Sequence, residues 1–572
     1  MTSKPRVARF SSVEGLITAA RWPNVSPRTL LALVSQLMAT RRYDEAYSLL
    51  AELSAERPGH PLLLAAAGLF QARLDGQLTD AIDKLDKAVA SGPGLPNYFR
   101  GLVLTQLPAR LGRTDDAIAD LELVLALPDR FPVGLRRAAQ RALAEAYRTA
   151  GRTEDSVTAL SKVGVTAGSD LPALTTDYQL NEQDGFRFSP PALRELADRV
   201  FVAQGYDFAD IAFVVTESSL VVIDAGSTED NVRAALQAVR AETTLPISHV
   251  IITHGHFDHV GGLNALLGPG VEVIAQSGFA AEVEHQNDVP LLWKRFMPAD
   301  ADHRVHAEPD RLIAEPQTMT IGGVDFHLVP VHGGETDDAL LIDLPGRGVT
   351  FVGDVLMPYL GSPFFAEGSA EGLIDTLRTI EALGPRVLIH GHSTLTANFP
   401  VGRVPALRAA FDDLYQVIRA DIRDGATVFD ILDRNHLPEV LRDNPDAVLP
   451  YLIMRDNMIR RVQRQRTGYW QADLDSIDPV TPAAWAGVLD LLTGGDEATY
   501  TRVIHDLLDR DDLPPALRLA DLALRNNPAS AQIAELRRET LLRLVERNQT
   551  LAPFKFIVYA ELADLTVPAF QG

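Results

Sequence analysis

Three histidines and an aspartate stand within six consecutive positions of HVIITHGHFDHVGG, residues 249–262. Imidazole and carboxylate groups bind transition metals, and this chain contains no cysteine that could supply thiolate ligands. Of the 14 histidines, 11 fall in the quarter of the chain that ends at His392. The pattern predicts a metal site, and its first candidate ligands are His254, His256, Asp258 and His259.

The spacing of these four residues predicts two adjacent metal ions. In an extended backbone residues i and i+2 point the same way, so His254 and His256 can bind one ion. Asp258 and His259, at the turn into the next helix, can face a second ion. Two ions about 3.5–4 Å apart can share a hydroxide, lower its pKa and polarise a substrate oxygen. Histidine and carboxylate ligands suit zinc, iron and manganese to different degrees, and Asp258 could also steer a proton as a catalytic group.

Further ligands have to come from other strand ends, where the sequence offers acids and histidines. Glu335 lies in VHGGETDDA, Asp354 lies in FVGDV, and His392 lies in VLIHGHST. His332 competes with Glu335 for the same role. A lone acid at the end of an apolar strand is costly unless it is paired or bound to metal, which favours Asp354 as a bridging ligand.

Three more residues could assist the site without binding metal. Asp224 closes the apolar run LVVID, where it could either act on the site or serve as a turn residue at the strand end. His390 precedes His392 by two positions and could support a ligand or contact the substrate. Tyr359 follows Asp354 and could line an apolar substrate groove.

The elements around these residues predict an α/β domain. Residues 211–227 indicate two β-branched strands joined by a polar turn, and residues 228–242 indicate an amphipathic helix. From there to His392 strands alternate with helices, and the charged loops follow strand ends. This pattern predicts a layered α/β domain with its site at the carboxyl ends of the strands.

Helical repeats are predicted before this domain. Four similar phrases align at Ala46, Ala81, Ala117 and Ser156, with steps of 35, 36 and 39 residues. The steps are close to the 34-residue period of tetratricopeptide repeats, and a generic helical bundle is the alternative. The predicted organisation is therefore repeats over 1–165, a linker over 166–190, the α/β domain over 191–402 and a helical segment over 403–572.

Composition limits the partners. The 76 acids outnumber the 53 bases, for a net charge of −23, so nucleic acid is not an expected partner. No signal peptide and no apolar window of 18 residues is recognised, which predicts a cytoplasmic protein without a membrane span. The repeats could recruit a peptide partner.

The stretch THGHFDHVGG, with VVIDAG before it and the Gly-Asp and His-Gly-His loops after it, resembles the metallo-β-lactamase superfamily of dinuclear hydrolases. That resemblance covers roughly residues 195–400 and implies an αββα sandwich. The superfamily binds its first metal with a Gly-His-Thr loop, where this chain has Gly334-Glu335-Thr336. A glutamate there is similar to the alkylsulfatase branch, and residues 403–570 resemble the dimerisation domain of that branch.

The resemblance implies a dinuclear zinc enzyme that hydrolyses alkyl sulfate esters to alcohol and sulfate, and a homodimer formed through residues 403–572. Two features depart from the branch: Asp354 replaces a second glutamate, and the segment after it lacks the Asn- and Arg-containing sequence that grips sulfate. Another small-molecule ester, a lactone, a thioester, a phosphoester or a β-lactam therefore remains an alternative substrate. A different class of alternative is a repeat scaffold with a vestigial metal site.

Overall fold

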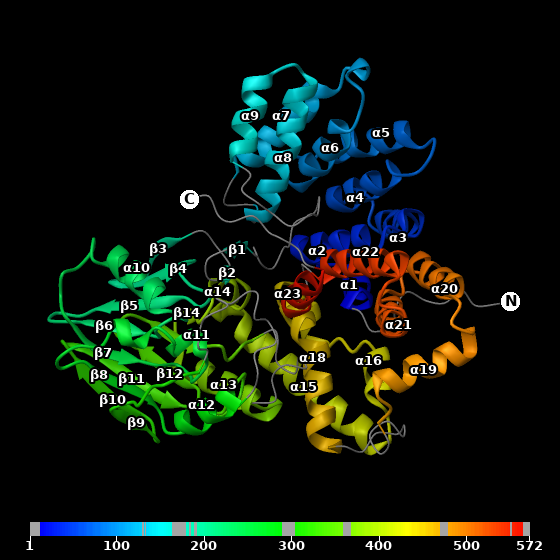
Figure 1. The fold of residues 1–572 in the computed structure, drawn as a ribbon. Helices are drawn as coiled ribbons and strands as arrows, with labels where there is room; N and C mark the ends of the chain where they lie inside the picture. The colour runs from blue at the N-terminus through cyan, green and yellow to red at the C-terminus, as the bar shows by residue number, and fades with distance from the viewer. Residues whose placement is uncertain are drawn as a thin grey trace. The chain divides into compact units, whose positions relative to one another are not determined.

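The computed structural model describes residues 12–127, 131, 133–162, 179–181, 185–187, 191–288, 304–357, 368–468, 479–548 and 552–563. They divide into two compact units. A helical unit holds the described residues of 1–174 and 469–566, and a second unit holds those of 175–468. The expected order of repeat-like helices, an α/β sandwich and a helical tail is confirmed (Figure 1).

The helical unit begins with nine α-helices. The phrases found in the sequence form every second helix from α3 to α9. The bounds are α1 (Ser12–Ala20), α2 (Pro27–Thr40), α3 (Tyr43–Glu56), α4 (Pro61–Gln71), α5 (Leu78–Val89), α6 (Leu95–Thr105), α7 (Thr114–Leu125), α8 (Val133–Thr149) and α9 (Thr153–Ser161).

Small residues let neighbouring helices of this unit approach closely. A Cβ atom at Gly68 of α4 would lie 2.9 Å from the Cγ of Leu85 on α5. A Cβ atom at Gly101 of α6 would lie 2.8 Å from the Cγ of Leu121 on α7. The two glycines are 33 positions apart, so the same close contact recurs at the repeat spacing.

The helices after residue 403 contribute to both units. The sandwich unit takes α15 (Val404–Arg423), α16 (Val428–Asp433), α17 (Val440–Asp443) and α18 (Val448–Thr467). The helical unit takes α19 (Pro482–Thr493), α20 (Glu497–Asp509), α21 (Leu513–Asn526), α22 (Ala531–Asn548) and α23 (Pro553–Leu562). In that unit α22 packs against α2, where Gln36 Nε2 donates to the carbonyl of Arg547 at 3.1 Å. No described helix is long and apolar enough to cross a membrane.

Two sheets form the sandwich. In the first, β3 to β6 pair antiparallel and β6 to β9 pair parallel: β3 (Ala192–Ala197), β4 (Val200–Gln204), β5 (Ile211–Val215), β6 (Leu220–Ile223), β7 (Ile247–Ile251), β8 (Glu272–Gln276) and β9 (Arg311–Ile313). In the second, β10 to β13 pair antiparallel and β13 and β14 pair parallel: β10 (Gln317–Ile321), β11 (Val324–Pro330), β12 (Leu340–Leu344), β13 (Val349–Gly353) and β14 (Val387–His390). Most of the predicted linker lies outside the described residues, but β1 (Gln179–Asn181) and β2 (Gly185–Arg187) pair within it.

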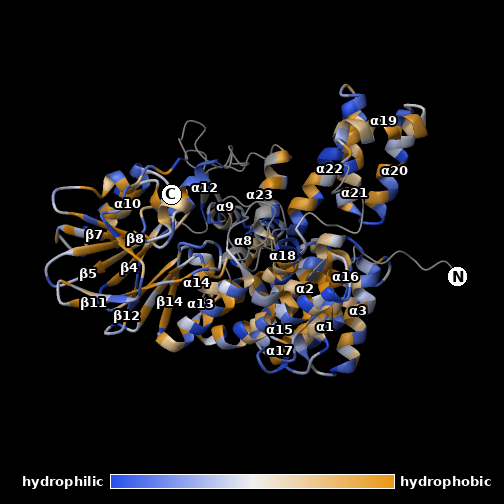
Figure 2. Cartoon of the chain, turned by 90° about the horizontal axis from the view of Figure 1, so that it is seen from below, coloured by the Kyte–Doolittle hydropathy of each residue, from blue (hydrophilic) through white to orange (hydrophobic). Residues whose placement is uncertain are grey.

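Alternate side chains of each strand face opposite layers. On β5, Ala212 and Val214 join the core between the sheets, whereas Phe213 joins the core beneath α10 (Glu229–Val239). Both faces of this strand are therefore apolar, and Figure 2 shows the strands coloured mainly as hydrophobic. Because β6 and β7 are parallel, their carboxyl ends lie at the same edge of the first sheet, and the same holds for β13 and β14 in the second sheet. The predicted site residues lie in the loops that follow these ends.

Candidate metal centre

The ends of four strands and one short helix bring the predicted ligands together. His254 and His256 follow β7, and Asp258 and His259 lie in α11 (Phe257–Val260), which begins directly after them. The remaining ligands follow other strands: Glu335 lies between β11 and β12, Asp354 directly follows β13, and His392 follows β14. All seven are buried, with exposed fractions of 0–6%.

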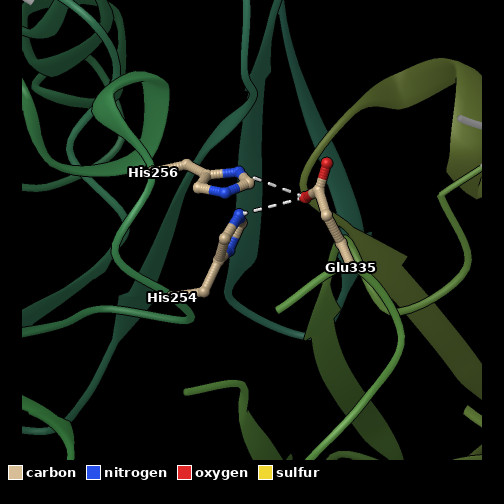
Figure 3. A group of neighbouring side chains, drawn as sticks. All are labelled: His254, His256 and Glu335. Atoms are coloured by element: carbon tan, nitrogen blue, oxygen red, sulfur yellow. Dashed lines mark ion pairs between the residues drawn. The ribbon is translucent and has the colours of Figure 1, made fainter. Parts of the chain in front are cut away.

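The first ligand group consists of His254, His256 and Glu335. The Oε2 atom of Glu335 lies 3.4 Å from His254 Nε2 and 3.3 Å from His256 Nδ1, and the three side chains point toward one another (Figure 3). Gly333 and Gly334 have φ angles of 122° and 78°, which glycine adopts without strain, and they turn the chain so that Glu335 faces inward.

The second ligand group consists of Asp258, His259 and His392. Asp258 Oδ2 lies 3.5 Å from the Nε2 atoms of both histidines. Asp354 lies beside the second group, with its Oδ2 3.0 Å from His392 Nε2 and 3.5 Å from His259 Nε2. Asp354 also forms a third group with His254 and His259. Because His254 belongs to the first group and His259 to the second, Asp354 connects the two groups of candidate ligands.

Hydrogen bonds to the outer ring nitrogens set which nitrogen each histidine offers. His259 Nδ1 donates to Asp224 Oδ2 at 2.8 Å, and His392 Nδ1 donates to the carbonyl of Phe208 at 3.0 Å. Thr253 Oγ1 donates to Asp224 Oδ2 at 2.8 Å and accepts from His254 Nδ1 at 3.1 Å. These bonds direct the Nε2 atoms of the three histidines toward the centre, where a bound metal would meet them.

The polar atoms of the centre fit a cation. His254 Nε2, His259 Nε2, Glu335 Oε2 and Asp354 Oδ1 are buried and have no hydrogen-bond partner in the described part of the chain. Leaving such atoms unsatisfied costs about 1–3 kcal/mol each, and a bound cation would satisfy them. Mixed histidine and carboxylate donors suit zinc, iron and manganese.

The electrostatics favour the ligand forms of two of these residues. Burial, together with His259 and His256, lowers the pKa of His254 well below its ordinary value, so its imidazole is neutral. Burial alone would raise the pKa of Asp354, but His392 and His259 outweigh it and lower that pKa well below its ordinary value. Asp354 is therefore a carboxylate.

Other predicted residues lie outside the ligand groups. His332 is exposed, and its Nδ1 donates to the carbonyl of Asp337 at 2.8 Å. His390 is buried, but its Nε2 donates to the carbonyl of Phe399 at 3.1 Å. Tyr359 lies outside the described residues. Asp224 reaches the site only through its bonds to Thr253 and His259.

Sequence reasoning missed Gly391 and Gly368, which stand beside the ligands. A Cβ atom at Gly391 would lie 2.4 Å from Asp354 Oδ1 and 2.5 Å from His259 Cε1. A Cβ atom at Gly368 would lie 2.2 Å from the carbonyl oxygen of Gly334 and 2.7 Å from that of Glu335.

The carbonyl of Gly368 is held in turn by α18. It accepts hydrogen bonds from Arg461 Nη2 and Gln465 Nε2, both at 3.0 Å. The helix therefore supports, through Gly368, the turn that carries Glu335.

We predict that Gly391→Ala lowers metal affinity about 10–100-fold, because the new methyl group displaces Asp354 and His259. Competition with a chromogenic chelator measures the affinity. Gly402→Ala is the matched control, since no atom lies within 4 Å of a Cβ atom there. Unchanged affinity in the Gly391 variant would show that the ligands tolerate the added group.

Replacing Glu335 and His332 separately distinguishes the two candidate ligands. Glu335→Ala is expected to lower the metal content of the purified protein, because the carboxylate faces both His254 and His256. His332→Ala is expected to leave the metal content unchanged, because that side chain is exposed and bonded elsewhere. Elemental analysis of both variants tests this, and the opposite pattern would assign the ligand to His332.

Comparisons with known proteins agree with this geometry. The family model of the metallo-beta-lactamase superfamily matches residues 205–392. The chain is 24% identical over 377 residues to an alkyl/aryl-sulfatase of Saccharomyces cerevisiae, covering 59% of this chain and 57% of that protein. It is 30% identical over 154 residues to a hydroxyacylglutathione hydrolase of Rhodobacter capsulatus, covering 27% of this chain and 50% of that protein.

A solved structure shares the fold. The stereoselective inverting secondary alkylsulfatase of Pseudomonas sp. superposes with a TM-score of 0.55 at 19% identity, covering 66% of each chain. The chain spans 57% to 64% of the length of the alkylsulfatases that it matches. Within this chain, residues 205–392 are a metallo-beta-lactamase domain.

Proposed function

We propose that this protein is a dinuclear metal-dependent hydrolase, with zinc as its first-choice metal. The observation that carries the proposal is the pair of buried ligand groups joined by Asp354. When bound, the two cations supply a nucleophilic water and polarise the substrate oxygen. A vestigial site is disfavoured, because every one of the seven predicted ligands faces the same centre.

The residues of the chain prepare the centre for that chemistry. The hydrogen bonds from His259 to Asp224 and from His392 to Phe208 hold the imidazoles in one tautomer and orientation, so little reorganisation is needed. Burial of the ligands keeps bulk water away and strengthens their electrostatic interactions. Asp258 is the carboxylate proposed to orient a water and to steer its proton.

Within this function, we propose an alkyl sulfate ester as the substrate. The support is the position of Glu335 in the first ligand group and the similarity to alkylsulfatases over more than half of the chain. A thioester is the second candidate, because the hydroxyacylglutathione hydrolase shares the higher identity, although over a shorter segment.

A substrate panel on zinc-loaded protein tests both candidates. It contains dodecyl sulfate, an acylglutathione thioester, a lactone, a phosphodiester and a β-lactam. We expect sulfate release from dodecyl sulfate, reduced at least about 100-fold in Asp354→Ala because a bridging charge is lost. Thiol release alone would favour the thioester, and less than one metal ion per chain after zinc supplementation would contradict the dinuclear centre.

We further propose that the protein forms a homodimer through the helices after residue 403. In support, α19 exposes a row of apolar side chains: Leu491 is 87% and Leu492 is 77% exposed, beside Trp485 and Val488. Such surface is costly in water unless another molecule covers it. The peptide partner of the repeats and the cytoplasmic location stay predictions from the sequence.

The double variant Leu491→Glu, Leu492→Glu tests the dimer. Light scattering should give twice the chain mass for the unmodified protein and the single-chain mass for the variant, because buried charge opposes association. Leu267→Glu is the control, since Leu267 is an exposed leucine of the sandwich unit. An unmodified protein of single-chain mass would contradict the homodimer.

A further inference from the structure

A small cavity lies between the two sheets beside the candidate metal centre. Its polar lining comes from the ends of strands in both sheets, and the cavity volume is about 10 Å³. A cavity that holds one internal water has a volume of about 10–15 Å³ and offers the water two or more polar partners. The polar lining consists of Asp210, Asp224, Thr253, Gly353, His390 and Gly391.

Two polar atoms of this lining have no hydrogen-bond partner in the described part of the chain, Asp210 Oδ2 and His390 Nδ1. Because His390 Nε2 donates its proton to the carbonyl of Phe399, Nδ1 of the neutral ring carries a lone pair and accepts a hydrogen bond. A water in the cavity can donate to His390 Nδ1 and accept a hydrogen bond from a protonated Asp210. One internal water placed between the two atoms would satisfy both groups.

Asp210 is tied directly to the loop that carries a metal ligand. Its backbone N–H donates to the carbonyl of Gly391 at 2.7 Å, and the carbonyl of nearby Phe208 accepts from His392 Nδ1. Asp210 is only 6% exposed. A change of its charge would therefore act on the ligands through a medium of low dielectric constant.

The surroundings of Asp210 favour its neutral form when no cation is bound. Burial raises the pKa of Asp210 to about 8; Asp354 adds to this effect, whereas His392 and His259 oppose it. Asp224 and His390 also line the cavity. At pH 7 the Asp210 side chain is therefore mainly a carboxylic acid.

We propose that Asp210 and the adjacent cavity form a proton-holding site coupled to metal binding. The inference rests on the proposed metal centre but concerns a residue that is not one of its ligands. In the metal-free protein the Asp210 carboxylic acid is bonded to one water, which is bonded to His390. When divalent cations enter, their charge favours the carboxylate, so the acid O–H bond breaks and one proton leaves to solvent.

Zinc titrations at pH 7, in buffers of different protonation enthalpy, measure the protons released as the metal binds. The unmodified protein should release about one proton per chain more than Asp210→Asn, while both bind the same number of zinc ions. Asp343→Asn is the matched control, because Asp343 is equally buried in the sandwich but bonds to Thr350 Oγ1 instead. It should release as many protons as the unmodified protein. Equal proton release from the unmodified and Asp210→Asn proteins would overturn the proposal.

Infrared spectroscopy gives a second measurement, which observes the protonated carboxyl group itself. The metal-free protein at pH 7 should show a carboxylic acid C=O band that disappears when zinc is added. If no such band is lost while zinc binds, Asp210 holds no exchangeable proton and the proposal fails. If the unmodified protein binds no zinc, the proposed metal centre fails. A carboxylic acid band that is lost between pH 7 and 9 and is missing from Asp210→Asn would still report the proton on Asp210, as distinct from the buried Asp338, whose pKa is raised to about 7.

Discussion

The architecture of this protein depends on gathering seven buried imidazoles and carboxylates within a few ångströms of one another. Polar groups of this kind are costly to bury unless each is hydrogen-bonded, paired or bound to an ion. The cost is distributed over the surrounding structure. Asp224, Thr253 and the carbonyl of Phe208 bond the outer nitrogens of His259, His254 and His392, so the other ring nitrogens of these histidines face the centre.

Sheet topology makes this gathering practical. Each sheet has a parallel pair, β6 with β7 and β13 with β14, and the carboxyl ends of these pairs meet at the same edge of the sandwich. Loops leaving such ends need no regular pairing of their own, so they can carry polar residues while the apolar strands hold them rigidly. The strands hold the site rigid, and the loops after them carry the candidate ligands.

The sequence was informative where one short segment carries the signal. His254 to His259 predicted neighbouring ligands because the spacing of two positions in a loop is a local property. Strand ends likewise indicated Asp354 and His392, and the repeated phrases indicated α3, α5, α7 and α9. The choice of Glu335 over His332 depended on a turn whose direction is set by Gly333 and Gly334, so spacing alone left it open.

The remaining features are contacts between distant segments, which no local pattern reveals. The hydrogen bonds of Asp224 to Thr253 and His259 span 29 and 35 positions, and Arg461 reaches Gly368 across 93. The division of the helical tail between two compact units is of the same kind, because amphipathic helices indicate an apolar face but not the partner that covers it.

The support that α18 gives to Gly368 also bears on how such a protein can evolve. Since Arg461 and Gln465 hold the carbonyl of Gly368, which stands against the turn of Glu335, α18 supports the candidate metal centre. Recombination that joined this sandwich to a foreign tail at residue 403 would discard that support, whereas a junction after Gly468 would keep it. The contact between α18 and Gly368 therefore favours inheritance of the sandwich and α18 together.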